Sequence, residues 1–273
     1  MYIAVICGGL SAERDVSISS GTGAARALRA RGHKVALVDL FLGNPSAVND
    51  PRSVFTSDAG DSVYSVRETE PDLDKIRAQR GGKGLIGPGV IEICRAADIA
   101  FLALHGAEGE NGKLQACLDL YGVPYTGSGY LGSALAMDKE LSKILFRSSG
   151  IPTPPGVTLR RGDAAPESIG FPCVVKPCSG GSSVGTSIVT EPEKLPGALE
   201  EAFSCDEAVL VEKYIRAREL TVGVMDGRAM AVIEIIPKTG FYDYKNKYQA
   251  GLTEEICPAP ISAEDTERVQ RLA

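Results

Sequence analysis

The first half of the chain alternates short apolar runs with a segment of helical periodicity. Residues 2–7, 34–40 and 97–104 are almost continuously apolar, which is typical of strands buried on both faces of a sheet. Between the first two runs, residues 23–32 ("GAARALRARG") follow a helical pattern that ends at Gly32. A strand–helix–strand order predicts parallel pairing, so we expect a parallel α/β domain at the N-terminus.

The rest of the chain up to residue 150 contains predicted loops, helices and one short strand. Residues 43–90 are rich in Gly, Pro, Ser and Asp and predict loops. Residues 113–122 predict a helix and 123–128 a short strand. Residues 131–150 form a long helical pattern that ends at a glycine, and Asp138 is a candidate cap for a second helical segment within it.

The pattern of hydrophobic and polar residues changes after the proline-rich residues 151–156. Alternating and apolar runs predict strands at 171–177 and 208–215 with a helix between them, and Asp226–Gly227 is a strong hairpin signal. Residues 241–260 predict a long tyrosine-rich loop, and Ser262 followed by acidic residues predicts a helix start. The second half is therefore expected to be α+β with antiparallel pairs.

Composition narrows the class of protein. The 273 residues are 44% hydrophobic with a net charge of −6, which disfavours a nucleic-acid surface, and no apolar run approaches the ~20 residues that span a membrane. Seven cysteines without a Cys-x-x-Cys motif fit reduced, mostly buried thiols. His33 and His105 are the only histidines, so a three-histidine zinc site is impossible. We expect a cytoplasmic protein.

The segment "KPCSGGSSVG" at 176–185 is the first candidate for chemistry. Lys176 ends a predicted buried strand, and glycines and serines follow it directly. Bare backbone amides in such a loop can form a concavity that binds phosphate, although the segment lacks the P-loop pattern. A simple turn after an ordinary surface lysine explains the same residues about equally well.

A group of carboxylates is the second candidate for a functional site. A predicted strand ends in Glu212 and Lys213, and Glu219 follows shortly afterwards. These residues fit a nucleotide clamp in which one carboxylate accepts the adenine amino group and another holds the ribose hydroxyls. A solvated charged edge is the plain alternative. The order of lysine, glycine-rich loop and carboxylates along the chain favours the clamp.

With these segments in this order, the chain resembles the D-alanine–D-alanine ligases of the ATP-grasp fold. The resemblance covers nearly the whole chain and rests on seven segments that follow the family's order: "GGLSAERDVS", "LHGAEGENGKLQ", "YTGSGYLGSALAMDK", "VVKPCSGGSSVG", "VEKYI…RELTV", "GFYDYKNKY" and "CPA". It implies an N-terminal α/β substrate domain at 1–130 and an ATP-grasp domain at 138–273. The latter would comprise a small subdomain at about 138–215 and the start of a C-terminal subdomain at about 216–273.

The resemblance also implies an activity. The ligase phosphorylates one D-alanine with ATP, and the amine of a second D-alanine attacks the acylphosphate to give the dipeptide used for peptidoglycan precursors. Glu13 would hold the ammonium of the first D-alanine, with His105 and Glu110 nearby. Taken alone, Glu13 is also an ordinary helix-start carboxylate, and His105 an ordinary loop residue.

The remaining implied roles concern ATP and a lid. The family pattern places the following residues at the nucleotide: Lys139, Lys176, Ser183, Glu212, Lys213, Glu219, Tyr242 and Lys247. Ser182 and Tyr248 would bond with Glu13 and hold the lid shut, which excludes water from the acylphosphate. The Lys247–Tyr248 pair favours an amine nucleophile over D-lactate, while D-serine stays open as second substrate.

Three further expectations follow from the resemblance. Family members form homodimers, so a homodimer is expected. They also continue beyond the helix near Ser262 with the residues that bind two Mg²⁺ ions. No metal site is therefore expected up to Ala273, and we expect the chain to be truncated and inactive while its parent protein is active.

Two alternatives remain. Another ATP-grasp carboxylate–amine ligase would share the nucleotide residues, but "SAERDVS" and "KNKY" belong to the D-alanine sites. A non-catalytic ATP- or amino-acid-binding protein would bind ATP without releasing ADP. A dinucleotide-dependent dehydrogenase is disfavoured because "CGGLSAE" lacks Gly-x-Gly-x-x-Gly.

Overall fold

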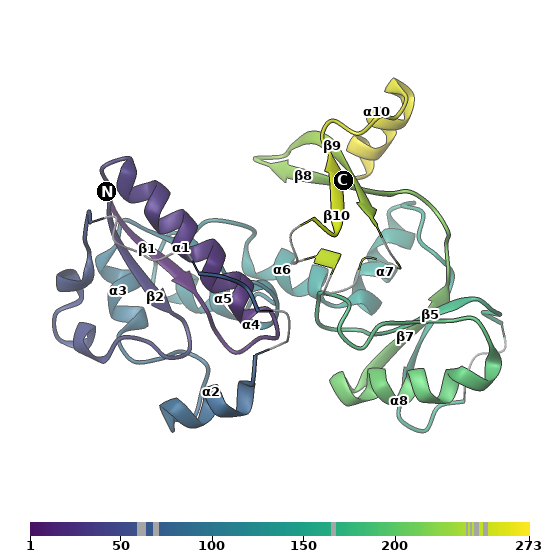
Figure 1. Ribbon diagram of the computed structural model, residues 1–273, viewed down its shortest axis with the longest axis horizontal. Coiled ribbons are helices and arrows are strands. Elements are labelled where there is room, and N and C mark those ends of the chain that lie inside the picture. Colours follow the sequence, from purple (N-terminus) through teal and green to yellow (C-terminus); the bar gives the residue numbers. More distant parts are fainter. Residues whose placement is uncertain are drawn as a thin grey trace. The chain divides into compact units, whose positions relative to one another are not determined.

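The computed structural model divides into two compact units, Met1–Asp138 and Lys139–Ala273 (Figure 1). It describes the following residues: 1–58, 64–67, 71–164, 168–238, 240, 242, 246–247 and 251–273. Among these residues no helix is both long and apolar enough to cross a bilayer.

The first unit is built on a parallel sheet. Its strands β1 (Tyr2–Cys7), β2 (Lys34–Asp39) and β3 (Ile99–Leu102) lie in the order β2-β1-β3. Ile3 pairs with both Val35 and Ile99 across the two ladders. The carboxyl ends of all three strands therefore meet at one edge of the sheet, where loops of α/β proteins usually bind ligands.

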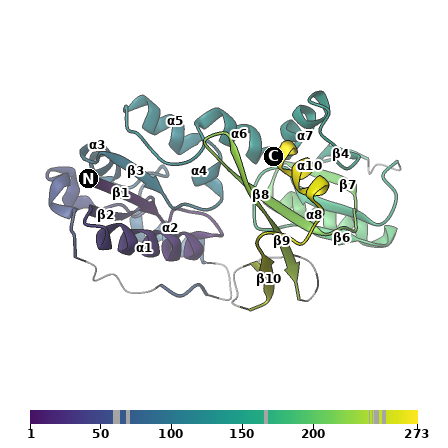
Figure 2. The same ribbon diagram turned by 90° about the horizontal axis from the view of Figure 1, so that it is seen from above.

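Helices cover both faces of this sheet (Figure 2). Helix α1 (Arg14–Ala30) packs on the face that carries Ile3 and Val5, whereas α3 (Val90–Ala96) and α5 (Lys113–Leu120) pack on the opposite face. This double covering explains why the strands are apolar at nearly every position. The smaller elements of this unit are η1 (Pro45–Val48), η2 (Pro51–Val54), α2 (Leu73–Arg80), α4 (Ala107–Glu110) and α6 (Tyr130–Met137).

The second unit contains an antiparallel sheet of order β4-β7-β5-β6. Its strands are β4 (Gly156–Arg160), β5 (Cys173–Pro177), β6 (Ser187–Val189) and β7 (Ala208–Lys213). Helix α8 (Leu195–Cys205), which follows the short η3 (Pro192–Lys194), covers one face. Helix α7 (Lys139–Ser148) begins the unit.

A second antiparallel sheet, of order β10-β9-β8, completes this unit. Strands β8 (Glu219–Met225) and β9 (Arg228–Pro237) form the predicted hairpin, and its turn residues Asp226 and Gly227 have φ of 50° and 73°. Helix α10 (Ala263–Leu272) begins as predicted, because Ser262 Oγ accepts a hydrogen bond from the amide of Asp265 at 3.0 Å.

The predicted fold class is confirmed, and local differences have simple causes. Residues 253–256 form strand β10 (Thr253–Ile256) inside the segment predicted as a loop, because they pair with β9 through the backbone. The strand predicted at 123–128 is wrong, since only an isolated bridge joins Tyr125 to Ala100. Residue Asp138 is extended and separates α6 from α7, as the sequence pattern suggested.

Candidate functional site

The first cluster of predicted site residues lies at the carboxyl edge of the parallel sheet. Glu13 is the residue before α1 and is buried, and its carboxylate lies against the Cα atom of Gly106 in the loop after β3. A Cβ atom at Gly106 would stand 2.3 Å from Glu13 Oε2, and the φ of Gly106 is +64°. Both features require glycine at this position. The Glu13 carboxylate therefore packs directly against the backbone of Gly106, which has no side chain.

Serines join the same loops. Ser11 Oγ donates to the carbonyl of His105 at 2.8 Å, and Ser20 Oγ lies 3.1 Å from His105 Nε2. Ser17 Oγ accepts from the amide of Gly8 and donates to a carbonyl just after β3, both at 2.8 Å. The structure thus brings Glu13 and His105 to one edge. Glu110, at the end of α4, is exposed to solvent.

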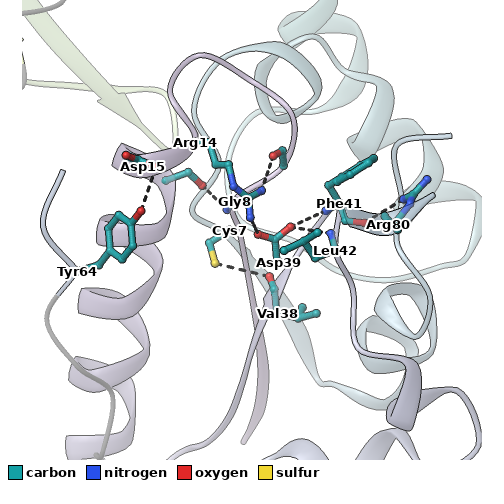
Figure 3. A network of polar contacts seen from close by, with 12 residues as sticks. Cys7, Gly8, Arg14, Asp15, Val38, Asp39, Phe41, Leu42, Tyr64 and Arg80 are labelled. Carbon is teal, nitrogen blue, oxygen red and sulfur yellow. Dashed lines mark hydrogen bonds and ion pairs between the residues drawn. The ribbon is translucent and has the colours of Figure 1, made fainter. Parts of the chain in front are cut away.

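A buried ion pair ties the loops after β1 and β2 together (Figure 3). The guanidinium of Arg14 contacts Asp39 and also donates to the carbonyl of Gly9. The other oxygen of Asp39 accepts from the amides of Phe41 and Leu42 at 2.9 and 2.8 Å. Both oxygens of the Asp39 carboxylate therefore have partners within the protein.

The neighbouring carboxylate, Asp15, is also held on all sides. Arg67 Nε donates to it at 2.6 Å and the Tyr64 hydroxyl at 3.0 Å. Burial acts to raise the pKa of Asp15, but the hydrogen bonds and charge of Arg67 together with Tyr64 hold that pKa below its ordinary value. Burial and the Asp15 carboxylate raise the pKa of Tyr64. Asp15 is thus an ionised structural anchor.

In the second unit, the pleat of the antiparallel sheet gathers the predicted nucleotide residues on one face. On β5 and β7, Val175 and Val211 face α8, so the alternate residues Lys176 and Glu212 face the other side. The register makes Lys176 and Glu212 diagonal neighbours, and their side chains form an ion pair. Gly156 on β4 lies opposite Glu212, where a Cβ atom would meet Glu212 Cβ at 2.7 Å.

A third charged residue completes this ion pair. Lys143 Nζ, from α7, donates to Glu212 Oε2 at 2.7 Å, to Thr153 Oγ1 at 2.9 Å and to the carbonyl of Pro154 at 2.6 Å. Burial acts to raise the pKa of Glu212, but the hydrogen bonds and charges of Lys143 and Lys176 hold that pKa below its ordinary value. Glu212 is therefore an ionised carboxylate shared by two lysines.

The glycine- and serine-rich loop after β5 forms the wall of a cavity. The cavity has a volume of about 340 Å³, and three lysines line it: Lys139, Lys176 and Lys247. Ser182 and Ser183, also in its lining, have φ of 52° and 61°, in the left-handed region that non-glycine residues rarely adopt. The backbone amides of this turn lie beside three lysines, a combination that suits an anion.

The ends of this loop are fixed by polar contacts. Lys139 Nζ donates to the carbonyl of Gly180 at 2.9 Å, and Ser183 Oγ donates to the carbonyl of Tyr242 at 3.0 Å. Lys247 Nζ lies 5.2 Å from the centre of the Tyr242 ring. Burial raises the pKa of Tyr242, and the negative charges of Glu255 and Glu219 act in the same direction. Predicted nucleotide residues of three chain segments thus lie at or beside the cavity.

The other predicted residues have different positions. Lys213 is the exposed last residue of β7, and its amide donates to Pro155 at 2.9 Å. Glu219 is the exposed first residue of β8. Tyr248 lies outside the described residues, so its contact with Glu13 and Ser182 stays a prediction. Within the described part of the chain, no group of three or more His, Cys, Asp or Glu side chains is arranged to hold a metal ion.

Sequence reasoning missed three residues that organise these sites: Lys143, Arg14 and Asp39. Lys143 stands four residues after Lys139, one helical turn further on the same face, and this spacing was the available signal. Arg14 begins the helix after the first apolar strand and Asp39 ends the second strand, so both lie near a common edge where opposite charges could have been paired.

Comparisons with known proteins agree with this geometry. The family model described as D-ala D-ala ligase N-terminus matches residues 2–128, and D-ala D-ala ligase C-terminus matches residues 145–273. A D-alanine–D-alanine ligase from Pediococcus pentosaceus is 42% identical over 100% of this chain and 80% of its own length. The chain belongs to the D-alanine–D-alanine ligase family.

Two solved structures are also similar to this chain. A D-alanine–D-alanine ligase from Bacillus anthracis complexed with ATP has a TM-score of 0.68 and 29% identity, covering 100% of this chain and 75% of the other. A D-Ala:D-Ser ligase from Enterococcus faecalis has a TM-score of 0.66 and 29% identity, covering 99% and 80%. These neighbours support the ATP-grasp architecture predicted from the sequence.

Proposed function

We propose that this protein joins two D-alanines to D-alanyl-D-alanine with ATP, as a cytoplasmic supplier of peptidoglycan precursors. Membership of the ligase family supports the reaction class. The observation that carries the assignment of the nucleotide site is the cavity lined by Lys139, Lys176 and Lys247 beneath a loop with two left-handed serines. Such a concave, cationic wall suits the phosphates of ATP.

In the first step, a carboxylate oxygen of one D-alanine forms a bond to the γ-phosphorus of ATP while the bond from that phosphorus to the β–γ bridging oxygen breaks. ADP leaves and an acylphosphate remains. The three lysines of the cavity offset the negative charge that the phosphates bring, which is the main electrostatic requirement of phosphoryl transfer.

In the second step, the neutral amine of another D-alanine attacks the carbonyl carbon of the acylphosphate. The carbon–oxygen bond to phosphate breaks, inorganic phosphate leaves, and the attacking nitrogen loses a proton. We assign Glu13 to the ammonium of the first D-alanine, because its buried carboxylate is fixed at the sheet edge with His105 nearby. Glu110 would support this region.

The remaining residues are assigned by the same proposal. Glu212 would accept the adenine amino group, Lys213 would offer backbone groups to the ring, and Glu219 would hold the ribose. Ser183 and Tyr242, which contact each other beside the cavity, would order the loop around the phosphates. Ser182 and Tyr248 would close over the reacting groups and exclude water.

We propose that Mg²⁺ accompanies ATP and that the protein forms a homodimer. The described residues do not provide a metal-ligand cluster. The mass of the protein in solution, measured by light scattering, tests the dimer, and titration of activity with Mg²⁺ tests the metal requirement.

The experiment that tests the function is a measurement of ADP release with ATP, Mg²⁺ and D-alanine, together with chromatography of the dipeptide. From the parent protein, to which the activity is assigned, we expect ADP and D-alanyl-D-alanine in equal amounts. ATP binding without ADP release would favour a binding protein instead. D-Serine offered in competition tests the second substrate, and we expect the D-alanine product to dominate.

A further inference from the structure

The charges around Glu212 do not balance. Two lysines share this single carboxylate, and no other carboxylate in the described part of the chain is paired with either of them. The three side chains differ in exposure: Lys143 is 6% exposed, Glu212 is 9% exposed and Lys176 is 24% exposed. The deepest cation faces only protein, whereas the shallowest one lines the cavity.

The environment of Lys143 explains how a buried cation is tolerated. Its three donors have three acceptors: Thr153, the carbonyl of Pro154 and Glu212. A buried ammonium with every donor satisfied keeps its charge at a modest cost. Lys143 therefore supplies a fixed positive charge at one oxygen of Glu212, whereas Lys176 contacts the other oxygen, and Lys143 is not part of the cavity lining.

We propose that Lys143 is a positioning residue that keeps Lys176 available to nucleotide phosphates. In a low dielectric, a lone Lys176–Glu212 pair would hold the ammonium tightly against the carboxylate. The charge of Lys143 offsets the carboxylate from the other side, so that the cluster retains one net positive charge. That charge resides on Lys176, the member that reaches the cavity. The inference rests on the proposed ATP site.

This role predicts a specific pattern of ligand binding. A residue that acts on phosphates through Lys176 affects ATP much more than adenosine, because only ATP carries the anionic chain. A residue that merely shapes the adenine pocket affects both ligands equally. The informative quantity is therefore the ratio of the ATP affinity to the adenosine affinity, measured by calorimetry without metal.

The variant Lys143→Met tests the proposal. We expect the ATP affinity to fall about tenfold while the adenosine affinity changes less than twofold, so the ratio falls. Lys143→Arg keeps the charge and should restore most of the ratio. Lys194→Met removes a surface lysine that pairs with Glu191 and is the matched control, with no expected change.

A second variant keeps the test open if Lys143→Met does not fold. Glu212→Gln removes the carboxylate that holds Lys176, so the ratio of ATP to adenosine affinity should rise above that of the original protein. Equal losses for both ligands in Lys143→Met, or an unchanged ratio in Glu212→Gln, overturn the inference. If the unmodified protein binds no ATP, the proposed nucleotide site itself is wrong.

Discussion

Two charged clusters of this protein, one in each unit, use buried charge in opposite ways. In the first unit, Arg14 and Asp39 form a balanced pair, and the remaining capacity of Asp39 is taken up by backbone amides. In the second unit, Glu212 is outnumbered by Lys143 and Lys176. A balanced pair fixes loops and offers nothing to a ligand, whereas an unbalanced cluster has charge left for one. The balance of charge therefore distinguishes the Arg14–Asp39 pair, which fixes loops, from the Glu212 cluster, which is proposed to bind a ligand.

The largest expected effect comes from breaking the balanced pair. Arg14→Met leaves the Asp39 carboxylate without its cation, and removal of one partner of a buried pair costs about 3 to 5 kcal/mol. We expect the free energy of unfolding, measured with urea, to fall by that amount. Asp39→Asn, which keeps the shape of the side chain, is the comparison variant. A change below about 1 kcal/mol in both would show that the pair is not a scaffold.

The second-largest effect is expected on catalysis, from a change in the Glu212 cluster. Lys176→Met removes a cation that lines the cavity, and loss of one such electrostatic contact lowers turnover by about 10²- to 10³-fold. We expect kcat/KM for ATP to fall by that factor in the ADP-release assay, with little loss of stability. Lys194→Met is again the surface control. Unchanged kinetics in Lys176→Met would remove this lysine from the nucleotide site.

A smaller effect, on KM for D-alanine, is expected from a change at Gly106, against which the Glu13 carboxylate packs. Gly106→Ala adds a Cβ atom that would meet the Glu13 carboxylate at 2.3 Å, in a backbone region that disfavours alanine. We expect KM for D-alanine to rise about tenfold, equivalent to ~1.4 kcal/mol, while ATP affinity stays unchanged. Gly122→Ala, at the same φ of +64° but with open space around it, isolates the cost of the backbone alone.

The smallest effect concerns acid stability. The folded-state pKa of Glu212 lies below the ordinary value of 4.5, so its ion pairs contribute fully above that pH and are lost as the pH falls through the folded-state pKa. The free energy of unfolding should therefore drop less steeply with acid in Glu212→Gln than in the original protein. Parallel acid profiles for the two proteins would contradict this expectation.

The sequence predicted the parts of the molecule that local pattern determines. Continuous apolar runs predicted the strands of the parallel sheet, and Asp226–Gly227 predicted the hairpin, because each pattern carries its own backbone preference. Lys176 and Glu212 were predicted as nucleotide-binding residues from their order along the chain, and that role stays a prediction. They face the same side of one sheet, as the pleat requires.

The rest depended on contacts between distant residues. Lys143 looks like a solvated residue on an amphipathic helix, and only the carboxylate 69 residues further on gives it a buried partner. Strand β10 has no alternating pattern, since its polar residues form a strand through backbone pairing with β9 alone. Strand β10 has no local signal in the sequence, and the spacing of Lys143 from Lys139 places it on a helix face without revealing its partner.

The alternation along β5 and β7 has a consequence for how this protein can change over time. Val175 and Val211 face α8, while their immediate neighbours Lys176 and Glu212 face the other side. Mutational tolerance along these strands should therefore follow a period of two, with volume selected at one position and charge at the next. The hydrophobic packing under α8 can drift through many apolar combinations without altering the ligand-facing side, so stability and activity can evolve almost independently within one strand.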